Sequence, residues 1–137
     1  MRIFFLIIIV SLYSFESIAC GALNGKGYQC ILFKKENDQK KYYTIGDKIF
    51  FIFNKKEIHE PFLNKDTSPM EISTHNHGFY NLNVENIEWN KGKYILNKKS
   101  STLLINNSGK FYFNCKFLGK PMDEILKFFK TESKYHE

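Results

Sequence analysis

The side chains best suited to chemistry in this sequence are the two imidazoles of His75-Asn76-His77. Alternate residues of an extended strand point to the same side, so both rings would share one face there. Neutral imidazole is a common ligand of zinc and copper, and a third ligand would come from His59 or Glu60. The same letters, followed by glycine, are also good turn composition. Two interpretations stay open: a zinc or copper site that uses His75, His77 and His59, or a polar turn.

Patterns for other chemistry do not occur in the sequence. There is no Gly-x-Ser-x-Gly elbow, no phosphate-cradling glycine loop and no dinucleotide fingerprint. Glu85 and Glu88 have the spacing of a carboxylate pair, but they flank an expected strand and should face solvent. We therefore predict that the chain is not an enzyme and uses no cofactor.

The N-terminus has the organisation of a secretory signal. Arg2 precedes an unbroken apolar run, Ile3 to Val10, which is too short for a membrane-crossing helix of about 20 residues. Ser17 to Ala19 places small residues where a signal peptidase cleaves. We expect residues 1–19 to be removed, so that an exported protein, periplasmic or secreted, begins at Cys20.

Cys20 has alternative fates. The segment Ser17 to Cys20 resembles the lipobox of bacterial lipoproteins, in which the cysteine is lipidated, although a lipobox usually has leucine where Ser17 stands. Lipid on Cys20 would tether the protein to a membrane, since each buried CH₂ contributes about 0.8 kcal/mol. Without lipid, Cys20 is a spare thiol near the mature N-terminus. An uncleaved N-terminal anchor is the third alternative.

Size and charge narrow the classes of partner. Removing 19 of the 137 residues leaves 118, enough for one domain but not for two well-buried cores. The leader holds one basic and one acidic residue, so the formal net charge stays at +6. Every basic residue after Arg2 is a lysine, and arginine is the usual tool for bidentate contacts with phosphate or guanine. We expect no specific nucleic-acid partner; the scattered lysines instead keep strand edges apart or attract anionic polymers.

Cys30 and Cys115 lie in the first and last predicted strands. Disulfides persist in the compartments that an exported protein reaches. A bond between these two cysteines would contribute about 4 to 5 kcal/mol by restricting the unfolded chain. The alternative is a pair of buried free thiols.

Alternation and turn residues predict a mainly β fold, a small antiparallel barrel or sandwich of seven to nine short strands. The domain should occupy residues 27–130, after a linker at 20–26. Two hairpins are the clearest, with turns at residues 90–92 and 107–109, each ending in glycine. In the last strand one face carries four inward side chains: Phe111, Phe113, Cys115 and Phe117.

The remaining strands are expected at Tyr28 to Lys34, Tyr42 to Ile45, Ile49 to Phe53, Met70 to Thr74 and Phe79 to Val84. The run Ile49 to Phe53 is apolar throughout, which is typical of a strand buried on both faces. Pro61 and Pro69 predict a long loop from Asn54 to Pro69, and His75 to Gly78 is expected to be a turn.

A short helix should follow the last strand. Pro121 suits the first helical position, and Asp123 and Glu124 suit the first turn. An apolar stripe is expected to pack on the sheet: Met122, Ile125, Leu126 and Phe129. Residues 131–137 should fray.

Tyr28 lies two residues before Cys30, and a late predicted strand holds Cys115. This arrangement is similar to that of small periplasmic lysozyme inhibitors, which are disulfide-linked β-barrels. The likeness covers only the first and last strands, and no inhibitory loop motif accompanies it, so we assign no family. It implies tight binding to a partner enzyme without turnover. We predict a non-enzymatic exported β-domain that binds another envelope component, a protein or a polymer, with an inhibitor as one example. The alternative is a metal-handling protein that uses His75 and His77.

Overall fold

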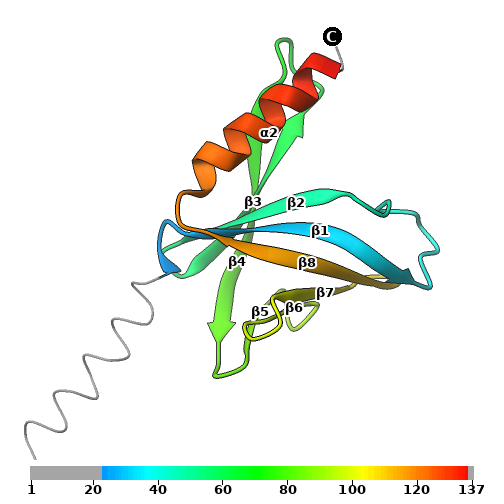
Figure 1. The fold of residues 1–137 in the computed structure, drawn as a ribbon, viewed down its shortest axis with the longest axis vertical. Helices are drawn as coiled ribbons and strands as arrows, with labels where there is room; N and C mark the ends of the chain where they lie inside the picture. The colour runs from blue at the N-terminus through cyan, green and yellow to red at the C-terminus, as the bar shows by residue number, and fades with distance from the viewer. Residues whose placement is uncertain (1–22, 136–137) are drawn as a thin grey trace, which may run out of the picture.

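The computed structural model of the protein describes residues 23–135. Eight antiparallel strands form a closed barrel, in which each strand pairs with the next along the chain and the last returns to the first (Figure 1). The elements are β1 (Gly27–Glu36), β2 (Lys48–Asn54), β3 (Glu57–Asn64), β4 (Glu71–Leu82), β5 (Asn86–Trp89), β6 (Tyr94–Asn97), β7 (Thr102–Asn106), β8 (Lys110–Leu118) and the helix α2 (Pro121–Tyr135). The prediction of a small antiparallel barrel or sandwich with a C-terminal helix is confirmed, and of the two alternatives the structure is the barrel. The leader and Cys20 lie outside the described residues.

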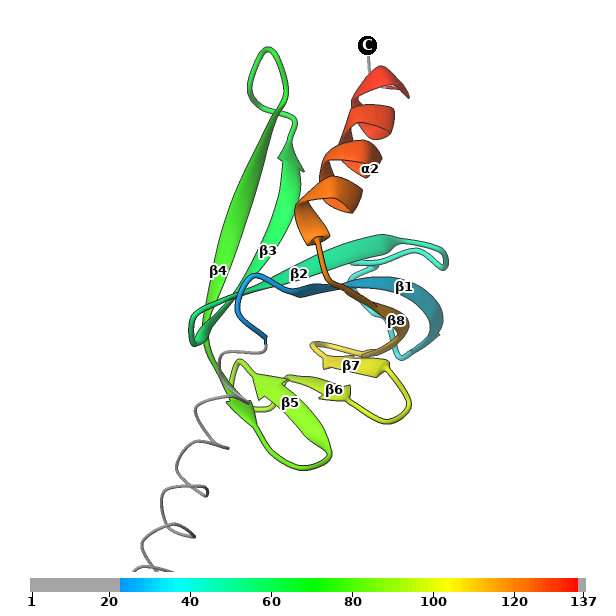
Figure 2. The same ribbon diagram turned by 60° about the vertical axis from the view of Figure 1, so that its left-hand side comes forward.

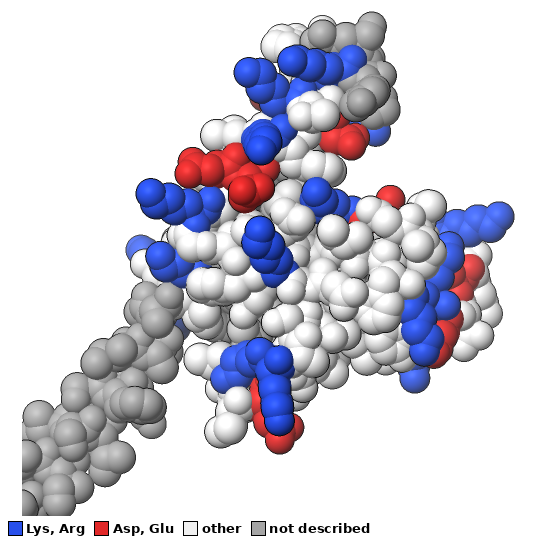
Figure 3. All heavy atoms as spheres, in the orientation of Figure 1, with Lys and Arg blue, Asp and Glu red and all other residues white. Residues whose placement is uncertain are grey.

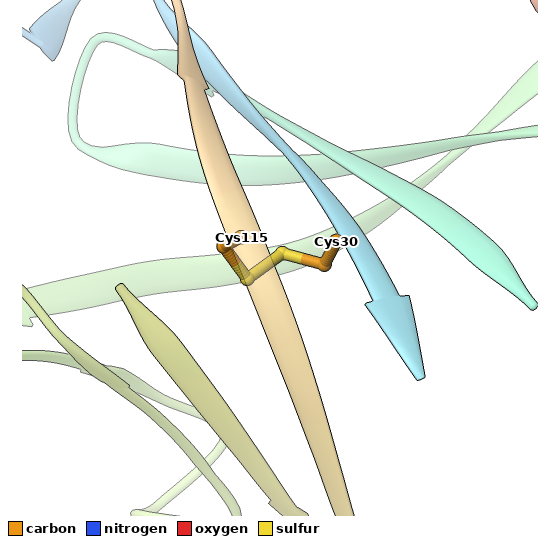
Figure 4. Close-up of a disulfide and its surroundings, with 2 residues drawn as sticks. All are labelled: Cys30 and Cys115. Carbon is orange, nitrogen blue, oxygen red and sulfur yellow. A yellow bond between two sulfur atoms is a disulfide. The ribbon is translucent and has the colours of Figure 1, made fainter. Parts of the chain in front are cut away.

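The predicted disulfide between Cys30 and Cys115 is present. The two cysteines are directly opposed on β1 and β8, the strands whose pairing closes the barrel, and their Cα atoms are 4.1 Å apart (Figure 4). They are separated by 85 residues in sequence, so the bond ties the start of the domain to its last strand. Cys30 is fully buried and Cys115 packs against the same core.

Strand β2 is buried on both faces, as its apolar sequence predicts. Phe51 and Phe53 point into the barrel, where aromatic and aliphatic side chains from the other strands surround them. Phe50 and Ile52 point outward and are covered by α2. Among residues 23–135 no polar or charged residue is fully buried, so the barrel encloses a packed apolar core.

Helix α2 packs on β2 through a stripe that shares Ile125 and Phe129 with the predicted one and adds Phe128. Ile125 is fully buried, and Phe128 and Phe129 lie 5.4 and 6.0 Å from the ring of Phe50. The prediction that Met122 and Leu126 belong to this stripe is wrong, because they are 46% and 52% exposed. The apolar residues of the helix lie on two neighbouring faces, and either face could have packed on the sheet. The face that carries Phe128 and Phe129 is the one that packs on β2.

The helix also continues beyond Lys130, where the sequence predicts that it frays. Two hydroxyl side chains donate hydrogen bonds to carbonyl groups of the preceding turn, Thr131 to Lys127 at 3.1 Å and Ser133 to Lys130 at 2.9 Å. The helical segment therefore ends at Tyr135.

The prediction of a long loop from Asn54 to Pro69 is wrong, because this segment contains β3. The turn from β2 to β3 has only two residues, Lys55 and Lys56, and Lys55 adopts a left-handed φ of 57°. Pro61 is tolerated within β3 because β2 pairs with this strand only as far as His59. Beyond that point β3 has a neighbour on one side only, and such edge positions accept proline.

The prediction of a turn at His75 to Gly78 is also wrong, because these residues form a β-bulge inside one continuous strand, β4. Ile58 pairs with Gly78 and His59 pairs with Asn76, so His77 is the extra residue. Gly78 has a φ of 83°, which glycine adopts without strain.

This bulge reverses the side-chain alternation of β4. On one side of it His75, although exposed, pairs with Glu60 and so lies on the same face as the buried Ile58. On the other side Tyr80 packs on the core while Phe79 is 73% exposed. Without the extra residue Phe79 would take the inward face.

Residues 42–45, predicted as a strand, belong to a loop between β1 and β2. Tyr43 anchors this loop by packing its ring 5.0 Å from Phe111 and 5.5 Å from Phe113. Of the apolar residues in this segment only Tyr43 packs on the core, since Tyr42 and Ile45 are 48% and 53% exposed.

The two predicted hairpins are confirmed, with positive φ angles at Gly92 and Gly109. The first turn has four residues, Asn90 to Lys93, and not the three predicted, because the pairing closes at Trp89 and Tyr94. The inward face of β8 is buried at Phe111 and Phe113, as predicted. Phe117 is 49% exposed because it lies at the end of the strand, where its ring rests 5.4 Å from Tyr28.

Candidate functional site

Strands β3 and β4 extend beyond the barrel as a two-stranded ribbon, which we call the arm (residues 60–79). The pairing of β2 with β3 ends at His59, and that of β5 with β4 begins at Tyr80. Figure 2 shows this hairpin standing clear of the other strands, beside α2. The arm is thus carried by the barrel but is not part of its closed wall.

A hollow of about 460 Å³ lies where the arm leaves the barrel, and we call it the end hollow. Its walls come from β4, from the β5–β6 turn, from the start of β6 and from the β7–β8 turn: His75, His77, Asn90, Lys91, Lys93, Tyr94 and Asn107. Lys91 and Lys93 are exposed, and no residue in this lining carries a carboxylate. The end hollow is therefore polar and cationic, in contrast to the apolar barrel interior.

His77 links the arm to the barrel. Its Nε2 atom lies 2.9 Å from Oε1 of Glu60, and its Nδ1 atom lies 2.8 Å from the amide nitrogen of Asn90. An amide nitrogen only donates, so Nδ1 of His77 accepts from Asn90 and Nε2 carries the proton that is donated to Glu60. With both ring nitrogens engaged and 4% of its side chain exposed, His77 acts as a structural tie.

Two tyrosines continue this polar chain into the end of the barrel. The ring of Tyr94 lies 5.1 Å from that of His77 and stacks on Trp89 at 5.2 Å. The hydroxyl groups of Tyr43 and Tyr94 share a hydrogen bond. Burial raises the pKa of both hydroxyl groups, and the charge of nearby Glu60 raises them further. Both tyrosines therefore stay neutral at ordinary pH.

The residues of the predicted metal site are only partly brought together. His75 and His77 share a face, as predicted, with ring centroids 4.5 Å apart. His59 does not join them, because it lies on the opposite face of β3 from Glu60, with its Nε2 atom 3.3 Å from Glu57. Within the part of the chain that the structure describes, no three His, Cys, Asp or Glu side chains are grouped so as to hold a metal ion.

Asn90 and Tyr94 are members of this site that the sequence analysis does not single out as partners of His77. The sequence predicts only that Asn90 belongs to a turn, and in the structure it has a left-handed φ of 53° there. Its contact with His77 joins two different elements, and spacing along the chain gives no sign of it. The one available signal was Gly78, because a glycine inside a strand pattern often marks a bulge.

A second hollow, of about 600 Å³, lies between α2 and the β1–β2 loop. Apolar groups such as Leu63, Phe128 and Phe129 share its lining with Lys48, Lys65 and Glu132. Figure 3 shows the basic side chains in separate groups on the face that it draws. We find no concentrated basic patch on the face shown.

Comparison of the chain with protein-family models, curated proteins and solved structures gives no match. In residues 23–135, no helix has the length and apolar character needed to cross a membrane.

Proposed function

We propose that this chain is an exported binding protein without enzymatic activity, which holds another envelope component, a protein or a polymer, at the base of its arm. The observation that carries this proposal is the contrast between a barrel filled with apolar side chains and an arm with a polar, cationic hollow at its base. A filled barrel leaves no chamber for a ligand, so recognition belongs to the outside of the molecule.

Two features support export. The first residues have the charge, apolar run and small residues of a signal peptide. The Cys30–Cys115 disulfide suits an oxidising compartment, since such bonds are rare in the cytosol.

His77 is better placed to hold the arm than to act as a general base. Both of its ring nitrogens are already hydrogen-bonded inside the protein, which leaves the exposed His75 as the imidazole of the lining that can reach a bound partner. The arm is held to the barrel by these bonds, which limits the cost of ordering it when a partner binds.

Site-specific cross-linking in envelope extract from the source cells tests the proposal. A photoreactive residue in place of Thr74, exposed on the arm, should capture one partner, and excess unmodified protein should compete it away. The same residue in place of Lys98, exposed in the β6–β7 turn, is the matched control and should capture little. Equal capture at both positions, or capture that does not saturate, would contradict the proposal.

A metal-handling role is the second candidate, and the contact between the His75 and His77 rings favours it. Zinc and copper titration of the protein distinguishes the two candidates. A His75→Ala/His77→Ala variant that binds either metal as well as the unmodified protein would eliminate the metal-handling role.

A further inference from the structure

One edge of β4 lacks a strand partner along the arm. Strand β5 pairs with β4 only at Tyr80, Asn81 and Leu82, and then the chain turns away at Asn90. Among the described residues no strand pairs with residues 71–79 on that side. We call this stretch the free edge of β4. Unpaired edges of this kind are templates for an additional strand.

The backbone groups along the free edge point outward. Pro61 has no N–H, so its antiparallel pair with Thr74 is of the kind that makes no hydrogen bonds within the pair. In such a pair the N–H and C=O groups of Thr74 face away from β3. By alternation the same holds for Ile72 and Asn76, two residues away on either side.

The free edge has few of the usual protections against strand addition. Between Ile72 and Asn76 there is no lysine, no proline and no acidic residue, and Thr74, His75 and Asn76 are exposed. The bulge at His77 limits pairing at the barrel end. An added strand would therefore pair with β4 from the tip of the arm to about Asn76. It would take the position that β5 would occupy if the chain did not turn away at Asn90.

The end hollow indicates the charge of such a strand. Side chains of an added strand alternate between faces, and those on the face of His75 would enter the end hollow. Lys91 and Lys93 stand there without a carboxylate in the lining, and the whole chain carries a net charge of +6. Acidic side chains fit this environment. A second copy of the chain would bring further positive charge to it.

We infer that the partner presents an extended, acidic polypeptide segment that adds as a strand to the free edge of β4 and places acidic side chains in the end hollow. The inference rests on the proposed binding function and names the chemistry of the partner. Strand addition obtains affinity from main-chain hydrogen bonds and specificity from alternate side chains in pockets.

The test is titration of the oxidised protein with three capped ten-residue peptides at low salt. An alternating valine–glutamate peptide should bind with saturation, and its affinity should fall as salt is added. A valine–lysine peptide should bind at least tenfold more weakly. The valine–glutamate peptide with every backbone nitrogen methylated should not bind, because it keeps the charges but cannot donate main-chain hydrogen bonds.

Variants locate the binding site. Lys91→Ala/Lys93→Ala should weaken binding of the acidic peptide at least fivefold, whereas Lys98→Ala/Lys99→Ala, a matched exposed pair, should leave it unchanged. Thr74→Pro removes an outward N–H and should abolish binding, and Thr74→Val, which keeps that N–H, should not. Amide exchange at Thr74 and Asn76 in the unmodified protein should slow when the peptide is present, a result that needs no variant to fold.

Three results would overturn the inference: binding of the methylated peptide as tight as that of its parent, unchanged exchange at Thr74 and Asn76, or a dimer in solution that Thr74→Pro dissociates. The last result would show that a second copy of the chain binds at the free edge. If the peptides fail while cross-linking from position 74 still captures a saturable partner, the strand inference fails and the binding function stands.

Discussion

At the scale of single residues, His77 joins three elements. It is the bulge residue of β4, it donates to Glu60 on β3 and it accepts from Asn90 in the β5–β6 turn. A histidine in an apparent turn motif therefore holds the arm in place. Its removal would leave a carboxylate and an amide without their partner in a partly buried site.

We predict that His77→Ala lowers the free energy of unfolding by about 2 kcal/mol, because Glu60 and Asn90 lose their hydrogen bonds. His75→Ala is the control: His75 is exposed, and its loss should cost less than about 0.5 kcal/mol. Urea unfolding followed by the fluorescence of Trp89, the one tryptophan of the chain, measures both. Equal losses would show that His77 is not a structural tie.

Three of the eight tyrosines should ionise later than the others, because burial raises the pKa of Tyr28, Tyr43 and Tyr94. The unfolded chain loses these protons near pH 10, before the folded chain does. The stability linked to them is thus complete below about pH 10 and declines as pH rises above it. Alkaline titration followed by tyrosinate absorbance should show a delayed fraction, which Tyr43→Phe makes smaller. A single transition for all tyrosines would contradict this prediction.

At the scale of elements, the bulge in β4 is what lets one strand serve two environments. It keeps His75 and His77 at the end hollow while it turns Tyr80 to the core and Phe79 to solvent. A regular strand would satisfy one of these requirements and not the other.

Gly78→Ala should destabilise the protein by about 1 kcal/mol, because alanine is strained at a φ of 83° although there is open space around this position. Gly119→Ala is the matched control, since Gly119 also has open space and no left-handed φ, and it should be neutral or slightly stabilising. Thermal unfolding compares the two variants. A neutral Gly78→Ala would mean that the bulge does not depend on its glycine.

Local patterns predicted most of the elements. The double burial of β2, the hairpins at Gly92 and Gly109 and the start of α2 at Pro121 depend on neighbouring residues, and all were recovered. The errors occur where a distant contact decides. From the sequence alone Pro61 indicates a break in the strand, because nothing local shows that β2 no longer pairs beside it. In the same way His75 to Gly78 indicate a turn, because nothing local shows that β3 pairs with them.

The candidate site was less accessible to sequence analysis than the fold. The two histidines could be placed on one face from their spacing. The bond from Asn90 to His77 could not be predicted, because it depends on how the β5–β6 turn meets the arm. The exclusion of His59 likewise depends on the direction of its side chain, on the face of β3 opposite Glu60.

At the scale of the whole molecule, the disulfide lies across the seam that closes the barrel. The pairing of β1 with β8 joins the start of the domain to its last strand, and Cys30 and Cys115 are opposed within it. The barrel carries the arm, the arm presents the free edge of β4, and the two together line the end hollow.

A Cys30→Ala/Cys115→Ala variant should lose about 4 kcal/mol of stability, because the unfolded chain is no longer closed into a long loop. Denaturant unfolding of the oxidised protein and of the variant measures the difference. A loss below about 1 kcal/mol would show that strand pairing alone holds the seam.

Intact-mass spectrometry of the protein isolated from its source cells tests most directly our proposal that this barrel is exported and oxidised. We predict a chain that begins at Cys20, with or without lipid, and in which alkylation before reduction does not modify Cys30 or Cys115. A chain that retains Met1 and carries alkyl groups on both cysteines would contradict the proposal.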